Sequence, residues 1–201
     1  MAARIAVLAS GGGTNLQAII DYYAAITLQG EAAGSIELVA SNRENAGALD
    51  RARGAGIPAE SFDATDDGTA LGNLLAKRSI DLVVLAGYLK RIPAPVIRAY
   101  HGRIINIHPG MLPDFGGPGM YGSHVHTAVL ASGATSTGVT VHFVDDEYDH
   151  GPVIAQWRVR VKIDDTAESL AGRVLSAEHI VYPRIVDMVC ALNGAGLTAD
   201  F

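Results

Sequence analysis

An asparagine and a histidine two residues apart, Asn106 and His108, stand before a proline at the end of an apolar run. Residues two apart on a strand point to the same side of a sheet, so the amide and the imidazole lie on one side. An amide N–H and an imidazolium N–H aimed at one point stabilise an oxyanion developing on a carbonyl, an effect worth roughly 100- to 1,000-fold in rate per donor. A histidine that only caps a turn is the alternative, and the pair alone does not decide between them.

An acidic turn, Asp145-Asp-Glu-Tyr-Asp149-His-Gly-Pro152, follows a strand-like segment further along the chain. Turns collect Asp and Gly for backbone reasons, so most of these carboxylates are expected to be solvated or to cap backbone N–H groups. A carboxylate that met His108 would favour the charged imidazole and accept the proton of an attacking amine. The turn therefore holds a candidate third member of the catalytic group.

A glycine loop, Ser10-Gly-Gly-Gly-Thr-Asn15, lies between an apolar run and a segment of helical periodicity. Backbone N–H groups in such a loop, with the positive end of a helix macrodipole behind them, bind phosphate. A turn that needs glycine only for close packing is the alternative. No lysine follows Gly13, and the dinucleotide frame read from Gly11 places Leu16 at its third glycine, so the loop is neither a Walker nor a dinucleotide loop. We expect a mononucleotide-like phosphate as its ligand.

Four other side chains carry weaker signals. His124 and His126 fall where the sequence turns helical at Ser123, which disfavours a metal site. His142 alternates within a strand and is expected to be a hydrogen-bonded interior histidine, and Cys190 is expected to be a small buried hydrophobe. No G-x-S-x-G motif is present, which removes support for triad hydrolase chemistry.

Short apolar segments alternate with segments of helical periodicity through the first half of the chain. The strands expected there are 5–10, 36–40 and 82–86, and the helices are 14–23, 46–55 and one around 71–76. Alternating strands and helices with continuously apolar strands predict the α/β class, with a mostly parallel twisted sheet covered on both faces.

The second half has longer strands and one long helix. Strands are expected at 103–107, 139–144 and 153–163, with an irregular loop at 110–123. Asp165-Thr166 supplies an N-cap for a helix whose apolar stripe runs to Leu192, and Pro183 should kink that helix. No linker interrupts the chain, so we expect one domain of two subdomains that meet near residue 100.

The composition limits the class of partner. The chain has 201 residues, 15 Lys plus Arg against 21 Asp plus Glu, and 49% hydrophobic residues, which describes an acidic globular protein. Without a basic run it is not expected to bind nucleic acid or anionic membrane. The absence of a long apolar stretch and of a signal-peptide pattern, together with a single cysteine, indicates a reducing, cytoplasmic location.

Four motifs occur in the order seen in the folate-dependent formyltransferases. They are Leu8-Ala-Ser-Gly-Gly-Gly-Thr-Asn-Leu-Gln-Ala-Ile-Ile20, Leu85-Ala-Gly-Tyr88, Asn106-Ile-His-Pro109 with Leu112-Pro113, and Asp146-Glu-Tyr-Asp149-His-Gly-Pro152. The chain closely resembles this family from Arg4 to about Leu192. The resemblance implies a Rossmann-like formyltransferase fold over residues 1–201, with a phosphate-binding half to about residue 100 and a catalytic and folate-binding half after it.

Within the family, the glycine loop resembles that of members acting on 5′-phosphoribosylglycinamide. The resemblance therefore implies transfer of the formyl group of 10-formyltetrahydrofolate, a co-substrate, to the amine of that acceptor in purine biosynthesis, without a metal. It implies that Asn106 and His108 stabilise the oxyanion of a tetrahedral intermediate and that Asp149 assists proton transfer. The implied partners are small molecules, and the protein is expected to be a monomer or a homodimer.

The resemblance also assigns binding residues. For the acceptor these are Gly12, Gly13, Thr14, Asn15 and Glu178. For the folate they are Tyr88, Leu89, Lys90, Arg91, Ile92, Ile97, Asp146, Glu147, Tyr148, His150 and Gly151. The chain departs from the family's pattern at Gly110-Met111, in a longer loop between Asp114 and His124, and at Leu175, where some relatives carry a polar side chain toward the phosphate.

Three other functions compete with this one. Methionyl-tRNA formyltransferase and formyltetrahydrofolate deformylase share the chemistry, but each carries an additional domain, and the catalytic block already fills these 201 residues. The acidity of the chain also weighs against tRNA as an acceptor. A non-catalytic folate- or nucleotide-binding module is the third, and the intact trio of polar groups argues against it.

Overall fold

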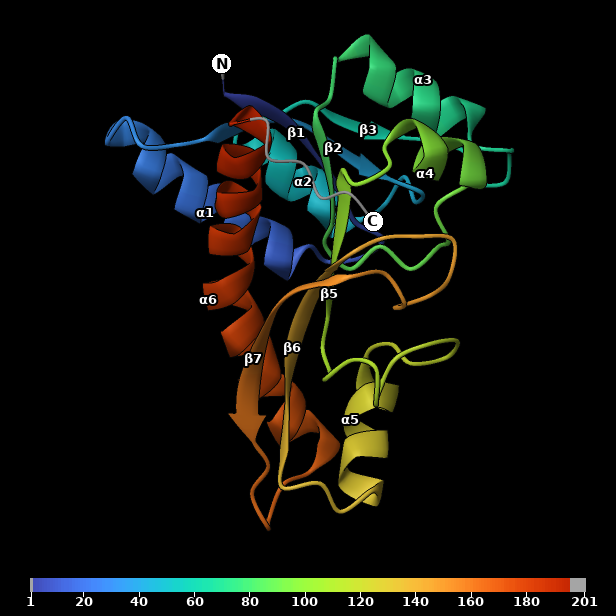
Figure 1. Ribbon diagram of the computed structural model, residues 1–201. Helices are drawn as coiled ribbons and strands as arrows, with labels where there is room; N and C mark the ends of the chain where they lie inside the picture. The colour runs from blue at the N-terminus through green and yellow to red at the C-terminus, as the bar shows by residue number, and fades with distance from the viewer. Residues whose placement is uncertain (1, 196–201) are drawn as a thin grey trace.

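A seven-stranded sheet runs through the computed structural model, which describes residues 2–195 of the chain (Figure 1). The strands are β1 (Ala3–Leu8), β2 (Gly34–Ser41), β3 (Ala59–Ser61), β4 (Leu82–Leu85), β5 (Ile104–His108), β6 (Ser136–Phe143) and β7 (Val153–Arg160). The helices are α1 (Thr14–Leu28), α2 (Gly47–Gly54), α3 (Thr69–Lys77), α4 (Ala94–Ala99), α5 (Ser123–Ala131) and α6 (Ala167–Gly194). The predicted α/β class is confirmed.

The order of the strands explains why the sheet is mostly but not wholly parallel. It is β3-β2-β1-β4-β5-β6-β7, and every neighbouring pair from β3 to β5 is parallel. Parallel neighbours need crossover connections, which the helices between them supply. Then β6 pairs antiparallel with β5, and β7 antiparallel with β6. The sheet is continuous across residue 100 because β4 and β5 pair, and the division into halves there stays a prediction.

The sheet buries both faces, as its continuously apolar strands require. In β1, Ile5 and Val7 pack into a core with α1, α2, α5 and α6, whereas Ala6 and Leu8 pack into a second core with α3 and α4. Figure 1 shows α1 and α6 on one side of the strands and α3 and α4 on the other.

Most predicted elements lie where the sequence placed them, and the differences have local causes. The sequence analysis missed β3 and α4, which have three and six residues and are too short to show a period. The alternation of residue types predicted a strand to residue 163, but β7 ends at Arg160. Its pairing with β6 ends there, at Ser136 opposite Arg160. The predicted loop 110–123 is confirmed up to Ser123, where α5 begins.

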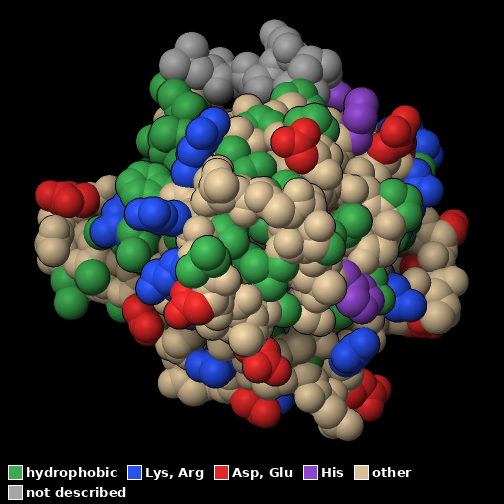
Figure 2. All heavy atoms as spheres, turned by 90° about the horizontal axis from the view of Figure 1, so that it is seen from below, with side chains coloured by type: hydrophobic (Ala, Val, Ile, Leu, Met, Phe, Trp, Pro, Cys, Tyr) green, Lys and Arg blue, Asp and Glu red, His purple; other side chains and the backbone are tan. Residues whose placement is uncertain are grey.

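The long helix α6 has the cap that the sequence predicted. Thr166 Oγ1 accepts a hydrogen bond from Ser169 N, and Ser169 Oγ accepts one from Thr166 N, at 3.2 and 3.0 Å. The helix continues through Pro183 to Gly194, and Cys190 is buried as expected. Among the described residues, no helix is both long and apolar enough to cross a membrane. Figure 2 shows acidic and basic side chains interspersed over the face seen from below.

Tyr182 anchors α6 to two neighbouring strands of the sheet, β4 and β5. Its side chain is fully buried, and its hydroxyl donates to the carbonyl oxygen of Leu85 at 2.9 Å and lies 3.3 Å from that of Ile105. Burial holds the pKa of Tyr182 well above its usual value, so the phenol stays a donor throughout the neutral range. One side chain therefore connects α6, β4 and β5.

We expect Tyr182→Phe to lower the free energy of unfolding by about 1 kcal/mol, because it removes a buried donor and no carbon atom. Urea denaturation measures this change. The matched control is Tyr22→Phe on α1, where the side chain is half-buried and the effect should stay below about 0.5 kcal/mol. Equal stability of the two variants would contradict the anchoring role.

Candidate active site

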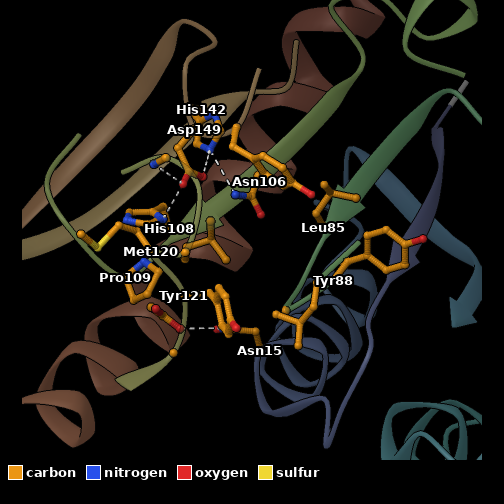
Figure 3. Close-up of a pocket in the computed structure, with 18 of the residues that line it drawn as sticks. Asn15, Leu85, Tyr88, Asn106, His108, Pro109, Met120, Tyr121, His142 and Asp149 are labelled. Carbon is orange, nitrogen blue, oxygen red and sulfur yellow. Dashed lines mark hydrogen bonds and ion pairs between the residues drawn. The ribbon is translucent and has the colours of Figure 1, made fainter. Parts of the chain in front are cut away.

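A cavity of about 660 Å³ opens at the carboxyl ends of β4 and β5, where α/β sheets place their ligand sites (Figure 3). Loops after β4, β5 and β6 line it together with the start of α1 and the first turns of α6. The residues that line it and were predicted as site residues are Asn15, Tyr88, Leu89, Lys90, Arg91, Ile92, Asn106, His108, Glu147, Tyr148, Asp149 and Glu178. The structure thus brings most predicted site residues around one hollow.

Asn106 and His108 come from β5, where they occupy alternate positions on one face of the sheet. His108 is 3% exposed. Its Nε2 lies 2.7 Å from the carbonyl oxygen of Phe115, which can only accept, so Nε2 carries a hydrogen. Its Nδ1 faces Asp149 instead, as the labelled side chains in Figure 3 show. At 3.5 Å from Asp149 Oδ2 this contact is longer than an ordinary hydrogen bond, so Nδ1 can be shared between Asp149 and a ligand.

Asp149 reaches this face from the loop after β6, in a left-handed backbone conformation with φ of 55°. Its Oδ2 lies 3.5 Å from His108 Nδ1 and accepts a hydrogen bond from Gly117 N at 3.0 Å. Burial acts to raise the pKa of Asp149, but the hydrogen bond and charge of His108 and the Gly117 N–H together hold it below its usual value. Asp149 is therefore a carboxylate at neutral pH, and folding stability gained from it is lost as pH falls through its lowered pKa.

His142 is a functional neighbour that the sequence analysis left as an interior histidine. Its Nδ1 lies 2.7 Å from the carbonyl oxygen of Phe143 and must donate, which leaves Nε2 to accept from Asn106 Nδ2 at 3.1 Å. Burial lowers the pKa of His142, so the ring stays neutral and keeps this role. The bond fixes the amide nitrogen of Asn106, and its second N–H is free to point into the cavity. The role of His142 could have been found only from the register of the strands, because Asn106 and His142 lie directly opposite each other on β5 and β6.

The other end of the cavity is formed by Asn15 and Glu178. Asn15 Nδ2 donates to Glu178 Oε2 at 2.7 Å, whereas Asn15 Oδ1 is buried without a hydrogen-bond partner. Burial raises the pKa of Glu178, against the opposing effects of the Asn15 hydrogen bond and the charge of His108. Because Oδ1 can only accept, Asn15 offers a place for a ligand hydroxyl or N–H.

The glycine loop lies beside this cavity and only partly in it. Gly12 lines a second pocket of about 480 Å³, and Gly13 and Thr14 line neither of the two. Gly13 has φ of 73°, and a Cβ there would come within 2.8 Å of Ala48 on α2. Close packing against α2 therefore accounts for this glycine, as the alternative in the sequence analysis had it. Arg51 donates from Nε to the carbonyl oxygen of Gly12 at 2.7 Å, which places a cation beside the loop.

Four of the predicted folate residues do not line the cavity. Ile97 is buried in the core with α3, and His150 forms an ion pair with Asp145 at 2.8 Å. The Asp146 carbonyl accepts from Arg91, and Gly151 packs on the Phe143 carbonyl so closely that a Cβ would collide with it. Ile97 therefore belongs to the core, and the other three residues hold the loop after β6 beside the cavity.

The other lining residues were not among the predicted site residues. They are Leu85, Gly87, Ile107, Pro109, Gly117, Pro118, Gly119, Met120, Tyr121, Gly122, Ser123, His126, His142, Val144, Asp145, Ala167, Glu168, Ala171 and Gly172. Leu175, singled out as a departure, lines the cavity near Glu178 and gives that end an apolar side chain. Among the described residues, no three His, Cys, Asp or Glu side chains are grouped to hold a metal ion.

The sequence matches the formyl transferase family over residues 3–186. It is 43% identical over 194 residues to the chloroplastic phosphoribosylglycinamide formyltransferase of Arabidopsis thaliana, an alignment that covers 93% of this chain. The chain spans 65% of that relative's length. It is 38% identical over 188 residues to the phosphoribosylglycinamide formyltransferase of Escherichia coli K12, covering 90% of this chain and 84% of that protein.

The fold has a counterpart among solved structures. Glycinamide ribonucleotide transformylase 1 from Symbiobacterium toebii superposes with a TM-score of 0.84 at 38% identity, over 94% of this chain and 88% of that one. The family match spans most of the chain, and the bacterial relatives are similar over most of their own length. The chain therefore belongs to the formyl transferase family.

Proposed function

We propose that this protein transfers the formyl group of 10-formyltetrahydrofolate to the amine of 5′-phosphoribosylglycinamide, a step of purine biosynthesis. The observation that carries the proposal is the convergence of Asn106, His108 and Asp149 in one cavity, in a chain whose relatives are named for this reaction. Both proposed partners are small molecules, which suits a cavity of this size.

The donors of the oxyanion are the free N–H of Asn106 and the Nδ1–H of charged His108, which is shared with Asp149 across their 3.5 Å separation. The amine nitrogen attacks the formyl carbon, a C–N bond forms, and the carbonyl oxygen becomes an oxyanion. His142 fixes the Asn106 amide and the Phe115 carbonyl fixes the His108 ring, so neither donor has to reorient during the reaction.

The proton of the attacking amine goes to Asp149. Its lowered pKa keeps the carboxylate charged and available, and its Oδ2 lies 3.5 Å from His108 Nδ1. Collapse of the tetrahedral intermediate breaks the bond between the formyl carbon and N10 of the folate. The proton then passes to N10, so tetrahydrofolate leaves neutral at that nitrogen.

The cavity has a wall that fits a folate and an end that fits a sugar. Tyr88, Ile92 and Val144 supply apolar surface for the pteridine ring, and Lys90 and Arg91 supply positive charge for the glutamate carboxylates. At the other end, Asn15 Oδ1 accepts from a ribose hydroxyl or the glycinamide N–H. The phosphate then extends toward the glycine loop, where backbone N–H groups and the α1 dipole bind it.

The purified protein should release tetrahydrofolate from 10-formyltetrahydrofolate only when phosphoribosylglycinamide is present. The absorbance change of the folate follows the reaction, and mass spectrometry identifies the formylated acceptor. Release at the same rate without the acceptor would identify a hydrolase and overturn the proposal.

His108→Ala and Asp149→Asn should each lower kcat by roughly 100- to 1,000-fold, because each removes a group that acts in the transition state. Circular dichroism and thermal melting check that both variants remain folded. His101→Ala, an exposed histidine outside the cavity, should keep wild-type kcat. Near-normal turnover of either cavity variant would show that the assigned roles are wrong.

Asn15→Ala and Lys90→Ala should separate the two substrates. We expect Asn15→Ala to raise the KM for phosphoribosylglycinamide about tenfold, the value of one hydrogen bond, and to leave the KM for the folate unchanged. Lys90→Ala should raise the KM for the folate and leave the KM for phosphoribosylglycinamide unchanged. Steady-state kinetics with each substrate varied in turn measures both constants, and equal effects on the two substrates would contradict the proposed ends of the cavity.

A further inference from the structure

A row of polar side chains crosses three strands directly behind the proposed catalytic histidine. The strand register places His108 on β5 opposite Thr140 on β6, and Thr140 opposite Gln156 on β7. Thr140 is fully buried, and neither Thr140 nor Gln156 lines the cavity. The mechanism above uses neither side chain.

Thr140 and Gln156 hold the backbone that follows His108-Pro109. Thr140 Oγ1 donates to the Gly110 carbonyl at 2.7 Å and accepts from Leu112 N at 3.2 Å. Gln156 Nε2 donates to the Leu112 carbonyl at 2.9 Å and to Thr140 Oγ1 at 3.1 Å. The segment Gly110–Leu112 is thereby tied to β6 and β7 through side chains alone.

The held segment leads within three residues to the backbone groups that touch the catalytic side chains. Phe115 N donates to the Met111 carbonyl at 3.1 Å, which closes the turn. Phe115 O then meets His108 Nε2 at 2.7 Å, and Gly117 N donates to Asp149 Oδ2 at 3.0 Å. Between them, a Cβ on Gly116 would collide with Leu112 and lie 3.1 Å from Asp149 Cβ. Residues 115–117 therefore form a tight backbone clamp on His108 and Asp149.

We infer that Thr140 and Gln156 are positioning residues, which set the geometry of His108 and Asp149 through the 115–117 clamp. The inference deepens the proposed function and rests on it for its kinetic consequence. A displacement of about 1 Å in a catalytic group can cost about 100-fold in rate, so a clamp held by two side chains outside the cavity controls kcat. Substrate affinity depends on it much less, because neither side chain contacts the cavity.

Thr140→Val tests the inference with a change of one polar atom. It preserves the shape of the side chain but leaves Gly110 O without its donor and Leu112 N without its acceptor. We expect kcat to fall about 10- to 100-fold, with both KM values within about twofold of wild type. Gln156→Met, on an exposed edge-strand residue that tolerates substitution more easily, should lower kcat in the same sense and by less.

Thr137→Val is the matched control. Thr137 is also on β6 and fully buried, but its Oγ1 is buried without a hydrogen-bond partner. The same substitution there should leave kcat within about twofold of wild type, since it removes no bond. A kcat in Thr140→Val equal to that of Thr137→Val would overturn the inference.

A second readout does not depend on activity. The groups that face the Asp149 carboxylate are His108 on β5, His142 on β6 and the Gly117 amide. Loss of the amide contact should raise the pKa of Asp149 in Thr140→Val, which ¹³C NMR of the carboxyl carbon measures without substrates. An unchanged Asp149 titration would also overturn the inference, even if kcat fell. If wild-type protein does not formylate the acceptor, the proposed function fails, and the NMR comparison still tests the clamp.

Discussion

The antiparallel pairing of β5 with β6 is the constraint on which the site depends. Its register sets His142 opposite Asn106 and Thr140 opposite His108, so each proposed oxyanion donor has a fixed neighbour on the next strand. On its other side β5 pairs in parallel with β4, whose last residue, Leu85, lines the cavity. The strand β5 thus joins two parts of the sheet. The cavity opens at the carboxyl ends of the parallel strands, and the antiparallel strands hold the side chains that β5 presents to the cavity.

The loop after β6 adopts an unusual backbone conformation where it approaches β5. Asp149 adopts φ of 55°, a conformation that side-chain-bearing residues rarely take, and it is held there by Gly117 N and by the histidines it faces. Two residues later, Gly151 passes so close to the Phe143 carbonyl that no Cβ fits. Backbone strain at such a point persists only where the surroundings enforce it, which is the condition for bringing a carboxylate from a separate loop to His108.

The sequence predicted the parts of this arrangement whose signals are local. Asn106 and His108 are two residues apart on one strand, and the Thr166 cap precedes its helix directly, so both are visible without knowing which strands are neighbours. The roles of His142 and Thr140 are not, because they arise from the register between strands about thirty residues apart in the chain. Gly13 shows the same limit: its packing against Ala48 depends on where α2 lies.

The polar groups of the cavity indicate which way round the proposed acceptor binds. Asn15 Oδ1 can only accept and Glu178 carries a carboxyl group, so this end attracts hydroxyl and N–H donors and disfavours a phosphate. Leu175 adds no charge, and the protein as a whole carries a formal net charge of −6. Attraction of the phosphate must therefore be local, from the N-terminal N–H groups of α1 and from Arg51 on the Gly12 carbonyl. A phosphate drawn past Asn15 toward that loop leaves the amine at the opposite end, facing Asn106 and His108.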